Sequence, residues 1–219
     1  ALVTSELPGL PLESASNIRS FVDRGGVWLN FTGPRSQVGS LGPLESYKLV
    51  PGPLLPAEGI PRHEAGPAEF FQIDASSLGH PIFDVGESPA FTRALFAEPR
   101  FHMAHDFAMP SPDQAARTPG PHYPVEVAAR FTDGRSFIVE MAIEKGRVLH
   151  FTSTCDTTWN NLALTPAFVM VDRALRYCIL STRRELNHRA GEAVTWPAPP
   201  GARSGLFVMM PSTLPVSGL

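Results

Sequence analysis

Residues 27–31 (VWLNF) form a nearly continuous apolar run, and this run limits what the chain can fold into more than any other feature. A short run of this kind is typical of a strand buried on both faces of a parallel sheet. The preceding residues 13–24 show apolar side chains at helical spacing, and Gly25-Gly26 suits a helix C-terminus. With a further strand expected at 1–4, the pattern predicts a β-α-β unit and an α/β fold.

A second regular region covers residues 125–152. Apolar and polar residues alternate from 125 to 131 and again from 137 to 143, with the turn sequence TDGR between them. A second turn at 144–146 leads into residues 147–152. These segments predict a three-stranded antiparallel β-meander.

A helix is expected from Pro166 onward, because proline is well tolerated at the first helical position. The apolar residues that follow are spaced to form one stripe over about three turns, which we expect to pack on the sheet. The stripe consists of Phe168, Val171, Leu175, Cys178 and Ile179.

The remaining chain is less regular. Residues 33–124 hold many of the 23 prolines, and only two short strands are predicted there, at 69–73 and 100–107. We expect one α/β domain over residues 1–181. Residues 182–219 are interpreted as a linker and the start of a truncated β-rich segment, with a strand-like run at 206–210.

Charge and composition exclude several classes of partner. The formal net charge of −3 gives no electrostatic basis for binding nucleic acid or an anionic membrane. The two cysteines are too few for a disulfide framework. No apolar run is long enough to span a bilayer, and the chain begins as a strand without Met, so we expect upstream sequence, with any membrane anchor, to lie outside it.

Residues 21–31 (FVDRGGVWLNF) and 146–161 (GRVLHFTSTCDTTWNN) resemble the class I glutamine amidotransferase-like domain, in the version carried by bacterial membrane-anchored proteins of the aerotolerance-regulator (Bat) type. The resemblance implies a flavodoxin-like three-layer sandwich, here with a C-terminal antiparallel β-meander. It also implies a membrane-anchored parent protein, with this soluble domain expected outside the cytoplasm.

The family's catalytic residues are not found at the matching positions. Active class I amidotransferases carry a cysteine in the turn after a central strand, where this sequence has Thr32-Gly33-Pro34. The family's His-Pro-Glu run would fall at residues 152–154, which read TST. His150 lies two residues earlier, on the same side of a strand, so a shifted base remains an open alternative.

The loop at 153–161 is the best candidate for a binding site, because it follows a sheet strand at its carboxyl end. Thr154, Asp156, Trp159 and Asn160 are the predicted ligand-binding residues. The alternative is that these polar side chains cap backbone groups while Trp159 fills the edge of the core.

Catalysis would require Cys155 as a nucleophile, with His150 and Asp156 as the nearest partners in sequence. The alternative for Cys155 is an ordinary small thiol in the fold. No metal site is predicted, because His102 and His105 face opposite sides of a strand, and no cofactor is expected.

The sequence therefore favours a non-catalytic amidotransferase-like domain that binds a small ligand or a partner protein. Two alternatives stay open. One is a hydrolase or amidotransferase with relocated residues, Cys155, His150 and Asp156. The other is an architectural spacer in the parent protein.

Overall fold

The computed structural model describes residues 1–59, 70–109 and 123–182. Its centre is a five-stranded sheet with the order β1-β2-β7-β6-β5. β1, β2 and β7 are mutually parallel, whereas β6 and β5 are antiparallel to their neighbours, so the α/β class is confirmed. The strands are β1 (Leu2–Ser5), β2 (Val27–Phe31), β7 (Gly146–Phe151), β6 (Ser136–Ile143) and β5 (Val125–Arg130).

The expected β-α-β unit is present at the N-terminus. α1 (Leu12–Asp23) connects β1 to β2, and all five residues of β2 are buried, as a strand between two parallel neighbours requires. Two glycines follow the helix, and each is required for a different structural reason. Gly25 has a φ of +92°, and a Cβ on Gly26 would lie 2.5 Å from the Phe21 ring and its carbonyl oxygen.

The predicted meander is confirmed as β5, β6 and β7. In the first turn, the Phe131 N–H donates to the Arg135 carbonyl at 2.9 Å, and Gly134 adopts a φ of +92°. In the second, Ile143 pairs with Gly146, which leaves a two-residue loop in which Glu144 has a φ of +50°. Both expected hairpin turns are therefore present.

The expected C-terminal helix is α5 (Val169–Thr182), which follows the 3-10 turn η4 (Pro166–Phe168). Its buried residues are Met170, Ala174 and Cys178, at a spacing of four. Phe168 is 38% exposed, so the predicted stripe was wrong at that position. Because the 3-10 turn precedes the helix, Phe168 lies outside it. Small Ala174 instead faces the core, with Val171, Leu175 and Ile179 only partly buried.

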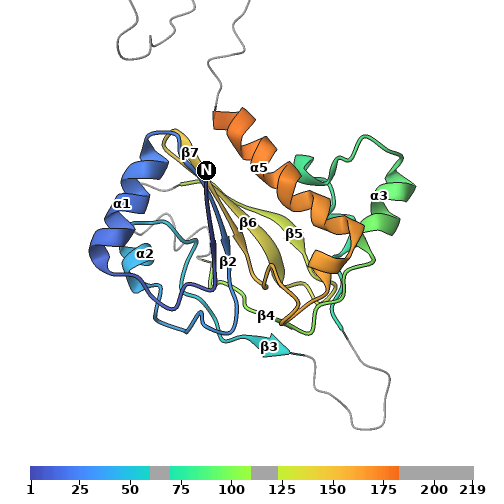
Figure 1. Ribbon diagram of the computed structural model, residues 1–219, viewed down its shortest axis with the longest axis horizontal. Helices are drawn as coiled ribbons and strands as arrows, with labels where there is room; N and C mark the ends of the chain where they lie inside the picture. The colour runs from blue at the N-terminus through green and yellow to red at the C-terminus, as the bar shows by residue number, and fades with distance from the viewer. Residues whose placement is uncertain (60–69, 110–122, 183–219) are drawn as a thin grey trace, which may run out of the picture. The chain divides into compact units, whose positions relative to one another are not determined.

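Helices cover both faces of the sheet (Figure 1). α1 and α2 (Gly42–Ser46) lie on one side, and α5 and α3 (Pro89–Phe96) lie on the other. Alternate residues of β2 divide between two apolar clusters: Trp28 packs with Ala15 and Val22 of α1, whereas Leu29 packs with Met170 and Ala174 of α5. The domain thus has three layers.

The two strands predicted in the middle region are mostly single bridges. Phe71 pairs with Phe101 and Leu54 pairs with Phe107, each as an isolated bridge. Only β4 (Met103–Ala104) forms a ladder, with β3 (Glu58–Gly59). Two 3-10 turns lie in this region, η1 (Ala75–Ser77) and η2 (Pro81–Phe83), and a third, η3 (Leu162–Leu164), follows β7.

Ala1–Arg184 form one compact unit by themselves. The strand-like run expected at 206–210 lies outside the described residues, as does nearly all of the segment 182–219. Among the described residues, no helix combines the length and apolar character needed to cross a bilayer.

Candidate functional site

The carboxyl ends of β1, β2 and β7 meet at one edge of the sheet, because the three strands are parallel. The Glu6 N–H donates to the Phe31 carbonyl at 2.8 Å, and the Thr32 N–H donates to the Phe151 carbonyl at 2.9 Å. At Gly33, a Cβ would lie 2.4 Å from Cγ of Glu6 and 2.8 Å from Cγ2 of Thr154. The three segments that follow these strands therefore converge, and the loop 153–161 does follow a sheet strand at its carboxyl end.

The loop 153–161 is closed by its own hydrogen bonds. The Asn160 side-chain amide donates to the Ser153 hydroxyl at 3.1 Å and to the Thr154 carbonyl at 2.8 Å, and its oxygen accepts from the Leu162 N–H at 2.9 Å. Thr154 and Asn160 are buried, and Trp159 is only 6% exposed. The capping alternative thus describes these three side chains, and their predicted role in ligand binding stays a prediction.

Asp156 is exposed, and its side chain makes a hydrogen bond within the same loop. Its carboxylate accepts the Thr158 N–H at 2.9 Å. That backbone hydrogen bond lowers the pKa of Asp156 below its ordinary value, so the side chain is an anion near neutral pH. An acceptor of this kind fixes the turn and is available to solvent on its remaining lone pairs.

His150 does not reach Cys155 or Asp156. Its Nδ1 accepts from the Asn30 side-chain amide at 3.2 Å, and its Nε2 donates to the Leu49 carbonyl at 2.8 Å. Cys155 packs near the opposite apolar cluster, with Sγ 3.5 Å from the Ser5 hydroxyl. The structure therefore does not bring together the three residues that the relocated-enzyme alternative requires.

The surroundings of His150 keep it neutral. Its side chain is fully buried, with the Trp28 and Phe107 rings at centroid distances of 5.5 and 5.3 Å. Burial lowers the pKa of His150 to about 4, although the hydrogen bond to the Leu49 carbonyl raises it in part. A neutral imidazole with both nitrogens engaged cannot serve as a general base without breaking a buried hydrogen bond.

His105 is a member of this edge that sequence reasoning did not select. Its ring lies between the Leu55 carbonyl, 2.8 Å from Nδ1, and the Gly33 carbonyl, 3.3 Å from Nε2, and it packs on Trp159 at 5.2 Å. His102 is exposed while His105 is buried, so the two histidines do face apart.

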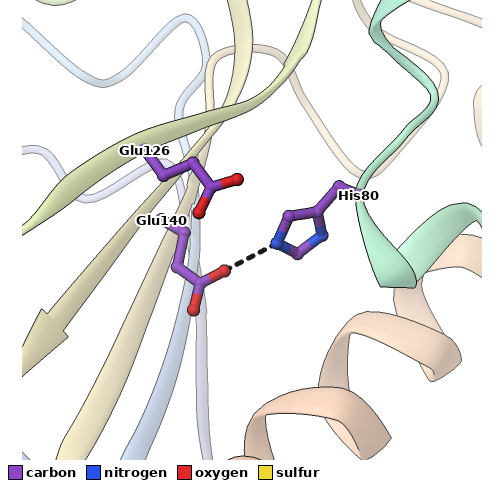
Figure 2. Close-up of side chains that lie close together, drawn as sticks. All are labelled: His80, Glu126 and Glu140. Carbon is purple, nitrogen blue, oxygen red and sulfur yellow. Dashed lines mark hydrogen bonds and ion pairs between the residues drawn. The ribbon is translucent and has the colours of Figure 1, made fainter.

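A second polar cluster lies between the sheet and α5, away from the carboxyl edge. His80 donates from Nε2 to the Glu140 carboxylate at 2.8 Å, and the Arg147 guanidinium pairs with the other oxygen of the same carboxylate. Figure 2 shows His80, Glu140 and Glu126 facing one another. Glu126 on β5 stands directly opposite Glu140 on β6. Sequence reasoning missed this cluster, because His80 is 60 residues from Glu140.

The electrostatics of this cluster centre on a buried carboxylate. Burial alone raises the pKa of Glu140, but the His80 hydrogen bond and the Arg147 charge outweigh it, so the pKa is held below its ordinary value. The pKa of Tyr177, whose ring packs edge-on against His80 at 4.9 Å, is raised by burial and by Glu140. Glu140 is therefore ionised, and Tyr177 is neutral.

Solvent reaches His80 from one side. A hollow of about 480 Å³ is lined by His80 together with residues of η1, η2 and the first turns of α3. Asp84, Glu87 and Arg93 also line it, so charged residues border the hollow.

The fold defines this chain as an α/β protein with a mixed central sheet. A solved structure has a similar fold. The "Cytoplasmic Protein STM3548 from Salmonella typhimurium" is similar with a TM-score of 0.50 and 15% identity, over 80% of this chain and 70% of that chain. The "Cytoplasmic Protein STM1381 from Salmonella typhimurium LT2" gives 0.47 and 16%, over 77% and 59%. The first likeness concerns the fold alone. No family model and no curated protein matches this sequence.

Proposed function

We propose that this chain acts by binding, as a non-catalytic amidotransferase-like domain. The observation that carries the proposal is the separation of His150 from Cys155, the base and the thiol that the relocated-enzyme alternative requires. Both ring nitrogens of His150 are hydrogen-bonded, one to Asn30 and the other to Leu49, while Cys155 contacts Ser5. Nucleophilic catalysis needs base and nucleophile within hydrogen-bond reach, and this pair has no such contact.

Exposed apolar side chains support binding to a protein. Phe91 on α3 is 51% exposed and Leu164 on η3 is 75% exposed. Phe168 at the end of η4 and Val169 at the start of α5 are also exposed. α3 contacts η4, and η3 contacts η4, so these side chains belong to neighbouring elements. Clustered exposed apolar groups are typical of interaction surfaces.

We further propose that the parallel part of the sheet, β1-β2-β7, corresponds to the flavodoxin-like core of the amidotransferase-like class. The resemblance of residues 21–31 and 146–161 supports this, since they cover the end of α1, β2, β7 and the loop after β7. The same resemblance is the basis for proposing a membrane-anchored bacterial parent, with the domain outside the cytoplasm.

Ammonia release from L-glutamine tests the non-catalytic part. We expect no release above buffer from the intact chain, and identical results for Cys155→Ala and His150→Gln. Turnover that Cys155→Ala abolishes would contradict the proposal and restore the relocated-enzyme alternative.

Cross-linking in the protein's own cells tests the binding part against the spacer alternative. We expect Leu164→Lys to reduce cross-linked partner yield, since it places a charge on the exposed apolar surface. Glu98→Gln, at an exposed residue just after α3, is the matched control. Equal yields in all three proteins would favour a spacer.

A further inference from the structure

Three potential ligands for a metal ion meet on one face of the sheet. His80 precedes η2, Glu126 lies on β5 and Glu140 lies on β6. One ligand atom from each lies within 4.8 Å of the others. Figure 2 shows the imidazole and both carboxylates turned toward a common point. The three ligands come from separate parts of the chain and are brought together only by the fold.

The charges at this point favour a cation. Glu126 and Glu140 are directly opposite in an antiparallel pair, where like charges destabilise the sheet. Arg147 neutralises one carboxylate through an oxygen of Glu140 that does not contact His80. Two glutamates and one arginine have a summed formal charge of −1, so a divalent ion is attracted to this point and offsets the repulsion between the two carboxylates.

Burial and access also fit. His80 and Glu140 are buried at 7% and 3% exposure, so they are fixed by their surroundings, whereas Glu126 is exposed. The hollow of about 480 Å³ is lined by His80 but by neither glutamate, and the exposed Glu126 is the ligand that solvent reaches. His80 and Glu140 are thus held in place, whereas the exposed Glu126 side chain can move to accommodate an entering ion.

We propose that His80, Glu126 and Glu140 bind a divalent transition-metal ion of the Zn²⁺ class. Imidazole nitrogen favours such ions over Mg²⁺ and Ca²⁺, and two carboxylates complete a three-ligand set with one position for water. Ligand atoms around a tetrahedral ion of this kind are about 3.4 Å apart. Only small side-chain movements separate the observed arrangement from that geometry.

Binding changes the position of a proton on His80. Without metal, Nδ1 accepts the Ile82 N–H at 3.4 Å, so Nε2 carries the proton that it donates to Glu140. A metal bond to Nε2 needs the lone pair of that nitrogen, and the proton then resides on Nδ1. The long hydrogen bond from the Ile82 N–H is lost when the metal bond forms.

Calorimetric titration of the chelator-treated intact chain with ZnCl₂ tests the proposal. We expect one ion per chain and at least a tenfold weaker affinity in Glu126→Gln, a variant chosen because its exposed side chain is not required for folding. Glu98→Gln is the control and should bind as the wild type does, and MgCl₂ should not compete at millimolar concentration. The absence of saturable binding, or equal affinity in Glu126→Gln, would overturn the proposal.

Nitrogen-15 NMR of His80 gives a readout that does not depend on affinity. We expect the protonated nitrogen to change from Nε2 to Nδ1 when one equivalent of Zn²⁺ is added. An unchanged His80 tautomer at saturation would place the ion elsewhere and overturn the proposal.

Discussion

The Asn30 side-chain amide donates a hydrogen bond to Nδ1 of His150 across the β2–β7 pair, at 3.2 Å. It is one link in a series that runs from the partly buried Thr4 to the fully buried His150. Trp28 Nε1 donates to the Thr4 hydroxyl and Thr4 donates to the Asn30 oxygen, each at 2.8 Å. His150 then donates to the Leu49 carbonyl. Every polar atom in this series has a partner, which is what burial demands of polar groups.

The stability of the domain should depend on the titration of His150. Its pKa is about 4 in the folded chain against 6.5 ordinarily, so between these values the unfolded chain binds the proton and the folded chain does not. The stabilisation of the folded chain that this pKa difference provides is complete above pH 6.5 and is lost as the pH falls toward 4. It amounts to about 3 kcal/mol.

Chemical denaturation at several pH values between 4 and 7 measures this effect. We expect His150→Gln to be less stable than wild type at pH 7 but to lose less stability on acidification. Glu140, whose lowered pKa also reduces stability in acid, is present in both proteins and cancels in the comparison. Parallel pH profiles would show that His150 does not titrate as stated.

Asn160→Ala should destabilise the domain by about 2–3 kcal/mol, because it leaves the Leu162 N–H without its side-chain acceptor and removes the amide that holds Ser153 and Thr154. Asn17→Ala, on the exposed face of α1, is the matched control and should change stability by less than about half a kcal/mol. Equal effects of the two substitutions in urea denaturation would contradict the closed loop.

Gly33→Ala should cost about 1–3 kcal/mol, because its Cβ would overlap Cγ of Glu6 at 2.4 Å. Combining it with Glu6→Ala removes that atom, so the double variant should recover part of the loss. Gly42→Ala, where a Cβ meets nothing within 4 Å, is the control and should be tolerated. Strict additivity of Gly33→Ala and Glu6→Ala would show that the side chains do not meet.

The sequence allowed the β-α-β unit and the meander to be predicted, because both depend on local periodicity and on glycines in turns. The role of His150 was harder to predict. Its spacing correctly placed it on a strand, but only the fold shows that Leu49, 101 residues away, takes its Nε2 proton. The His80 cluster was missed for the same reason, since a lone histidine beside Pro81 carries no signal of a glutamate 60 residues later in the chain.

The reactivity of Cys155 tests the central claim most directly. The intact chain is treated with iodoacetamide at pH 7 and modification of each cysteine is followed by mass spectrometry. Cys178, whose pKa burial raises to about 12, should stay unmodified in the folded chain. Cys155 should react no faster than the same cysteine in the unfolded chain, and equally fast in His150→Gln. A rate at least tenfold higher than in the unfolded chain, lost in His150→Gln, would contradict the account and reveal an activated nucleophile.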